Sequence, residues 1–107
     1  MRGANFLFGY VHGGKAYVAD MYGAEPFGAG SHPPDTDLGG SDDIIEYGGQ
    51  ESDGLTVLEF MIPLDSGDPY DQALFIGESY DVILAWGDQD SFDSYHVSRA
   101  WGEIILE

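Results

Sequence analysis

The chain has 107 residues and carries 20 acidic but only 3 basic side chains, so its formal charge at pH 7 is −17. Nucleic-acid binders need Lys and Arg to neutralise phosphates, so that function is excluded, and adsorption to an anionic membrane is disfavoured for the same reason. With 43% hydrophobic residues the chain can form one packed core, and its length predicts a single domain over residues 1–107.

The chain has no cysteine, which excludes disulfide frameworks, zinc–thiolate sites, iron–sulfur clusters and thiol nucleophiles. No apolar run approaches the roughly 18 residues of a membrane span, so direct membrane insertion is not expected. The sequence shows no basic start followed by an apolar stretch, the pattern of a secretory signal.

Glycine and proline divide the chain into short runs rich in β-branched and aromatic residues, which is typical of an all-β domain. The predicted strands are residues 5–11, 15–21, 42–47, 55–62, 80–86 and 101–106. We expect residues 12–14 to form a three-residue hairpin loop between the first two strands. The run 80–86 is the most apolar and is expected to be central. Residues 23–40 are expected to form an ordered loop, and the one helical possibility is a short turn near residues 89–95.

The acidic residues gather in predicted loops. Segment 88–93 has the D-x-D spacing of a calcium loop, although it lacks the glycine and glutamate of an EF-hand. Its candidate ligands are Asp88, Asp90 and Asp93. Segments 65–71 and 35–43 are acidic in a similar way. Because Asp caps turns through its own side chain, these segments are interpreted first as turns, with bound Ca²⁺ as the alternative.

No catalytic set stands out in the sequence. Paired carboxylates have no defined separation, and no nucleophile-elbow motif supports a Ser–His–Asp triad, so no enzyme activity is predicted. His12 and His32 are expected to be exposed. His96 lies between the acidic segment and the last predicted strand, where it is either a partly buried, hydrogen-bonded residue or a metal or haem ligand.

Several segments of the chain resemble the DOMON domain, a β-sandwich module of haem-binding cytochromes and of dopamine β-monooxygenase-type proteins. The resemblance covers nearly the whole chain and is closest to the single-module microbial form. The matching segments, in order, are 3–11 (GANFLFGYV), 16–20 (AYVAD), 32–36 (HPPDT), 38–44 (LGGSDDI), 58–60 (LEF), 64–68 (LDSGD) with Asp71, 82–87 (VILAWG) and His96. It implies an immunoglobulin-like antiparallel β-sandwich in an extracytoplasmic location, either secreted, periplasmic or cell-surface.

The resemblance also implies a ligand, which in this family is haem b or a carbohydrate. In the cytochrome members a Met early in the domain and a His late in it hold the iron, and these positions correspond to Met1 and His96. Met/His ligation suits electron transfer. The family resemblance therefore implies a haem b electron-transfer domain that serves a redox partner and has no catalysis of its own.

Two of the three basic residues adjoin these proposed ligands, since Arg2 follows Met1 and Arg99 comes three residues after His96. Either Arg could pair with a haem propionate, while the alternative for Arg99 is a surface pair with an Asp. Four aromatic residues are expected either to wall a flat cofactor or to belong to the core: Phe6, Phe8, Tyr95 and Trp101.

DOMON domains normally have one or two strands ahead of the Met position, and these are missing before Met1. We expect either a domain truncated at its N-terminus or a homodimer formed by strand exchange. The acidic surface predicts a redox partner with a basic docking surface. The alternatives are a non-catalytic module for a sugar or another small ligand, and a structural or interaction domain stabilised by calcium.

Overall fold

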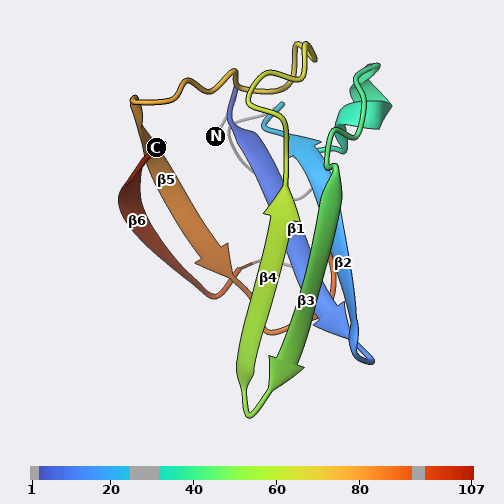
Figure 1. Cartoon of the computed structure of the whole chain (residues 1–107). Helices are drawn as coiled ribbons and strands as arrows, with labels where there is room; N and C mark the ends of the chain where they lie inside the picture. The colour runs from blue at the N-terminus through green and yellow to red at the C-terminus, as the bar shows by residue number, and fades with distance from the viewer. Residues whose placement is uncertain (1–2, 25–31, 93–95) are drawn as a thin grey trace.

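The computed structural model describes residues 3–24, 32–92 and 96–107 as an all-β structure in three antiparallel two-stranded sheets (Figure 1). The strands pair as β1 (Asn5–His12) with β2 (Lys15–Tyr22), β3 (Glu46–Ser52) with β4 (Leu55–Met61), and β5 (Ser79–Trp86) with β6 (Ser98–Ile105). The predicted antiparallel all-β class is confirmed.

The turn between β1 and β2 has two residues, not the predicted three, because His12 pairs with Lys15. Gly13 (φ 60°) and Gly14 (φ 77°) both have positive φ, as a type I′ hairpin turn requires. This turn follows the right-handed twist of the strands, so pairing continues for one residue more than predicted.

The predicted strand at residues 42–47 is wrong, since β3 begins at Glu46 and continues to Ser52. The sequence of β3 is polar and rich in glycine, so its intrinsic β-propensity is low. For that reason the strand was not recognised at its true position. Asp53 (φ 53°) and Gly54 (φ 77°) form a second two-residue turn, which holds β3 against β4. Strand pairing and this turn therefore override the local preference.

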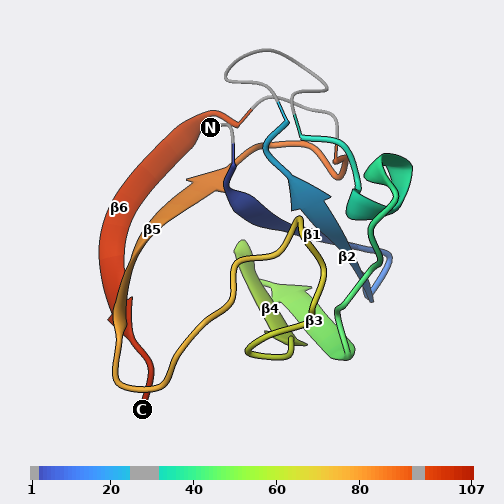
Figure 2. The ribbon, with the colours of Figure 1, turned by 90° about the horizontal axis from the view of Figure 1, so that it is seen from above.

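The prediction that the run 80–86 is central is also wrong. Among the described strands β5 pairs only with β6, and Leu84 and Trp86 are 62% and 52% exposed. Seen from above, this ribbon curves beside the other two (Figure 2). An apolar composition favours burial but does not specify a covering element, and no described strand pairs with the second edge of β5.

The described helix is the 3₁₀ helix η1 (Asp35–Leu38), which lies within the predicted loop 23–40. Residues 89–92 of the predicted helical turn are not helical, and the rest of that turn lies outside the described residues. Pro34, which precedes η1, forms an isolated β-bridge with Met21. This bridge fixes the start of η1 beside the end of β2.

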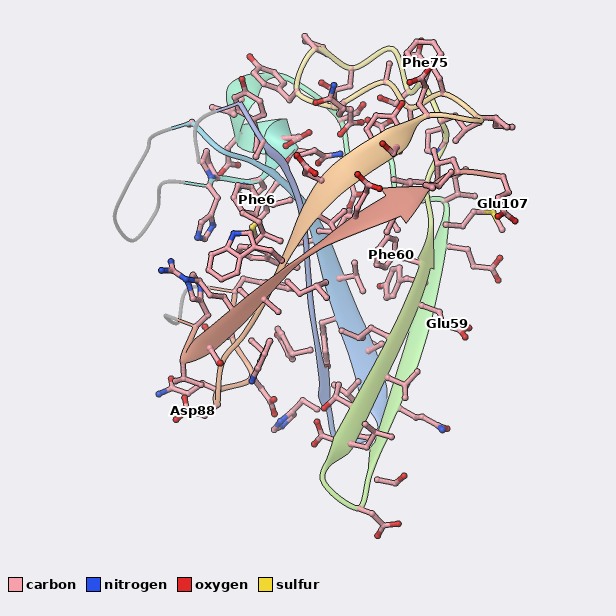
Figure 3. All side chains as sticks on the ribbon, turned by 90° about the vertical axis from the view of Figure 1, so that its left-hand side faces the viewer. Phe6, Glu59, Phe60, Phe75, Asp88 and Glu107 are labelled. Atoms are coloured by element: carbon pink, nitrogen blue, oxygen red, sulfur yellow. The ribbon has the colours of Figure 1, made fainter. Side chains whose placement is uncertain are left out.

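The first two ribbons pack closely at two glycines. A Cβ on Gly9 or on Gly49 would lie 2.8 Å from a Leu58 methyl group, so Leu58 occupies the space that both glycines leave open. Val11 is 3% exposed and pairs with Ala16 across the hairpin. On β4, Phe60 points between the ribbons while Glu59 points away (Figure 3). The buried apolar core of the described residues is small and consists of Val11, Ala16 and Met21.

Candidate functional site

An open cleft lies along the edge of β1 that faces away from β2. Its volume is about 770 Å³, within the roughly 300–1,000 Å³ range of small-molecule sites. The β3–β4 hairpin and the segment after β5 form its other walls. Four aromatic side chains line it: Phe8, Tyr10, Trp86 and Phe92. The ring centroids of Tyr10 and Phe92 are 4.9 Å apart.

The cleft joins an imidazole to an acidic rim. His96 lines it and is exposed, so the prediction of a partly buried residue is wrong. Glu51, Asp88 and Asp90 supply carboxylates, and no Lys or Arg is among the described residues that line the cleft. Asp90 Oδ2 lies 2.9 Å from His12 Nδ1, and both side chains are largely exposed. The cleft therefore offers aromatic faces, hydrogen-bond acceptors and one potential metal ligand.

The structure brings together only some of the predicted site residues. His96 and Phe8 share the cleft, while Phe6 lies beside it, with its ring centroid 5.5 Å from that of Phe8. His32 was expected to be exposed, but it is half-buried and its ring centroid is 4.5 Å from that of Phe8. The sequence did not indicate this contact of the His32 imidazole with the rings of Phe6 and Phe8.

The other predicted ligand residues lie elsewhere. Arg99 and Trp101 are on β6, with the guanidinium 5.4 Å from the ring centroid of Trp101. Trp86 pairs with Ser98, so these two side chains share one face of the β5–β6 ribbon. Alternate residues of a strand face opposite sides, so Arg99 and Trp101 lie on the other face. Four predicted site residues lie outside the described residues: Met1, Arg2, Asp93 and Tyr95.

A second candidate site lies where β2 and β4 end, beside η1 (Figure 1). Five carboxylates from four separate segments meet there: Asp20, Asp35, Asp43, Asp68 and Asp71. They form two groups that share Asp71, one with Asp20 and Asp43 and the other with Asp35 and Asp68, and the ligand atoms within each group lie within 4.8 Å of one another. We call these five residues the carboxylate cluster.

Burial makes the carboxylate cluster unusual. Asp35 is 0% exposed and Asp20 is 5% exposed. Within the described part of the chain, neither carboxylate oxygen of Asp35 has a hydrogen-bond partner, and Oδ1 of Asp20 and of Asp71 also lack one. The remaining oxygens are better satisfied, since Ser66 donates to Asp71 (2.6 Å) and the Asp43 backbone N–H donates to Asp20 (3.0 Å).

This environment changes the acidity of the cluster. Burial, together with the negative charges of Asp20 and Asp71, raises the pKa of Asp35 to about 7. Burial also raises the pKa of Asp71 to about 6 and increases that of Asp20. The pKa of Asp68 is lowered instead, because the backbone N–H groups of Ser41 and Tyr70 donate to its carboxylate.

Sequence reasoning noted segments 35–43 and 65–71 separately but missed Asp20. In the hairpin register Asp20 pairs with Leu7 and faces the same side as Val11, the side that packs against β3–β4. An Asp at an inward position of an apolar strand was therefore the available signal. By contrast, the calcium candidates Asp88 and Asp90 are exposed, and Asp90 faces His12.

The fold is that of a small all-β domain with an open cleft between its ribbons. The family model of the DOMON domain matches residues 1–87, so the chain belongs to the DOMON domain family, as its sequence motifs predicted. No curated protein and no solved structure matches the chain significantly. In the described part of the chain, no helix has the length and apolar character needed to cross a membrane.

Proposed function

We propose that this DOMON domain is a non-catalytic, extracytoplasmic ligand-binding module, and that its ligand is haem b, held in the cleft for electron transfer to a partner protein. One observation carries this proposal: the His96 imidazole and four aromatic side chains line the same cleft. An imidazole is a suitable iron ligand, and aromatic walls suit a flat apolar macrocycle. Bound haem would supply a redox-active iron.

The charges around the cleft restrict how haem fits. With Glu51, Asp88 and Asp90 on the rim and no described Lys or Arg in the lining, the two propionates fit only if they point toward solvent. Met1 would be the second iron ligand and Arg2 a propionate partner, as the family resemblance implies. Arg99 has the chemistry of a propionate partner too, but its guanidinium lies over Trp101 instead.

A carbohydrate is the second candidate ligand, and the acidic rim favours it. Carboxylates and the amide of Gln89 accept hydrogen bonds from sugar hydroxyls, and Trp86 offers a face on which a sugar ring stacks. A neutral sugar would meet no repulsion from Glu51 or Asp88. Its binding would make the domain an adhesion or targeting module.

The partner of the domain is also a proposal. A formal charge of −17 favours rapid encounter with a protein that has a basic docking surface, especially at low salt. Among the described strands, the cleft edge of β1 pairs with no other strand. A homodimer formed by strand exchange would supply a strand to such an edge.

A hemin titration of the purified protein tests the first proposal. We expect saturable binding with a low-spin absorption spectrum, oxidised and reduced. His96→Ala should abolish the low-spin spectrum because it removes the cleft imidazole. His32→Ala is the control, since His32 is a described histidine that does not line the cleft. Absence of hemin binding, or the same spectrum in His96→Ala, would contradict haem ligation by His96.

A glycan-binding screen tests the second candidate with two tryptophan variants. Trp86 lines the cleft, whereas Trp101 lies on the opposite face of the β5–β6 ribbon, and both are more than half exposed. Glycan binding that is lost in Trp86→Ala but retained in Trp101→Ala would assign the cleft to a sugar. Equal loss in both variants would place the sugar outside the cleft.

A further inference from the structure

The carboxylate cluster and the cleft lie toward opposite ends of β1. Asn5, the first residue of β1, lines a small cavity with Asp20, Asp43 and Asp71, while Leu7–Val11 line the cleft. We propose that the carboxylate cluster is a calcium site, with Asp71 shared between its two groups of ligands. This inference goes beyond the proposed function and does not depend on it.

The first observation is a concentration of buried oxygens without partners. In the described structure, every buried side-chain oxygen that lacks a hydrogen bond belongs to Asn5, Asp20, Asp35 or Asp71. An unpartnered buried carboxylate is costly, and buried charges are normally paired or bound to a metal. No described Lys or Arg forms an ion pair with these carboxylates. A cation would satisfy the orphaned oxygens together.

The second observation is the small cavity between these oxygens. The cavity lined by Asn5, Asp20, Asp43 and Asp71 has a volume of about 10 Å³. This is close to the space that one water-sized sphere needs, so a single ion fits there and an organic ligand does not. Asp35, Asp68 and Asp71 form the adjoining group of ligands. The cluster can therefore hold one ion in the cavity and has the ligands for a second.

The ligand chemistry selects calcium. All candidate donors are carboxylate or amide oxygens, with no His or Cys among them, which disfavours zinc and other transition metals. Calcium accepts six to eight oxygen ligands in a flexible geometry. Magnesium prefers a strict octahedron and keeps several waters, so it fits poorly among buried carboxylates.

Neighbouring hydroxyl groups already orient these carboxylates. The Ser41 hydroxyl lies within hydrogen-bond distance of the carboxylates of Asp43 (3.0 Å) and Asp68 (3.2 Å) and donates to one of them at a time, and the Ser66 hydroxyl donates to Asp71. Tyr70 donates to the carbonyl of Leu38 in η1 (2.9 Å). Supporting contacts of this kind orient metal ligands and increase affinity. The ion would join β2, η1 and the two long loops that have little apolar core of their own.

Calorimetric titration with CaCl₂ tests this proposal on chelator-treated protein in about 0.15 M KCl, which screens nonspecific attraction to the acidic surface. We expect saturable binding of one or two ions per chain and a raised melting temperature, because calcium binds only the folded state. Asp71→Asn should weaken binding at least about tenfold, because even changes to the outer partners that orient metal ligands cost roughly 10- to 100-fold, and Asp71 is a proposed ligand itself.

Two further variants keep the test decisive. Asp35→Asn also removes a ligand and places no charge at this fully buried position, so it should fold well while binding calcium at least tenfold more weakly. Asp37→Asn is the matched control, since Asp37 lies in η1 but is exposed and outside the cluster. The proposal would be overturned if calcium binding were not saturable. It would also be overturned if Asp37→Asn lost as much calcium affinity as the cluster variants, or if only Asp90→Asn lost affinity. Equal affinity for Mg²⁺ would overturn the assignment to calcium.

Discussion

Lowering the pH of the metal-free protein from about 7.5 to about 5 is expected to raise its melting temperature. Burial holds the pKa of Asp35 at about 7 and that of Asp71 at about 6 in the folded protein, against an ordinary value of 3.8. Between pH 3.8 and 7 the folded chain therefore binds more protons than the unfolded chain. Stability is then highest near the lower limit and is lost as the pH rises through the folded pKa values.

The expected gain is roughly 2–4 kcal/mol of unfolding free energy, because each titrating group contributes about 1.4 kcal/mol per pH unit within its window. For a domain of this size that corresponds to a shift on the order of 10 °C. Circular dichroism melts in chelator at both pH values measure it. A melting temperature that rises toward pH 7.5 would contradict the raised pKa values.

Asp35→Asn provides the internal check on this prediction. It should stabilise the metal-free protein at pH 7.5 and flatten the pH dependence, since an amide carries no charge to bury. Asp37→Asn should retain the full pH dependence, because Asp37 is exposed on the same short helix. Stabilisation of the metal-free protein by Asp35→Asn, combined with weaker calcium binding, would show that this residue is retained for the ion.

Gly49→Val is expected to destabilise the packing of the first two ribbons strongly. A Cβ at Gly49 would lie 2.6 Å from the backbone oxygen of Val57, 2.8 Å from a Leu58 methyl group and 3.3 Å from one of Val11. The oxygen belongs to β4, which pairs with β3, and cannot move away without disturbing that pairing. Overpacking of this kind costs about 2 kcal/mol or more, or roughly 10 °C in melting temperature.

Gly48→Val is the matched control for that experiment. Gly48 is the preceding residue on the same strand, and a Cβ there would meet no described atom within 4 Å. Because valine favours strands, this variant should leave the melting temperature unchanged or slightly higher. Similar losses in both variants would show that the contact between the ribbons at Gly49 does not limit packing.

The predictability of the fold differed from strand to strand. The strands β1, β2 and β4 were recognised because each is a short run rich in β-branched and aromatic residues that is bounded by turn residues. The strand β3 was displaced in the prediction because Gly48 and Gly49 lower its local propensity. Its position is set by pairing with β4 and by close approach to β1, and both are contacts distant in sequence.

The candidate sites were less predictable than the strands. His96 and Phe8 were identified from the sequence and lie in one cleft, whereas Trp101 and Arg99 were proposed beside them and lie on the outer face of β6. Alternation within a strand shows which residues share a face, but it does not show which face meets a neighbouring ribbon. Only the packing of β5–β6 beside β1 decided that Trp86 lines the cleft.

The amino-acid sequence by itself determined the all-β class, the hairpin of β1 and β2, and membership of the DOMON family, because alternation, turn residues and ordered motifs are local features. It also determined the net charge of −17, but not where the carboxylates lie in the folded protein. Tertiary structure decided that five of those carboxylates, distant in sequence, meet in a buried group around Asp71. Their pKa values and their capacity to bind a cation follow from that proximity and burial, which arise only when the loops pack against β2.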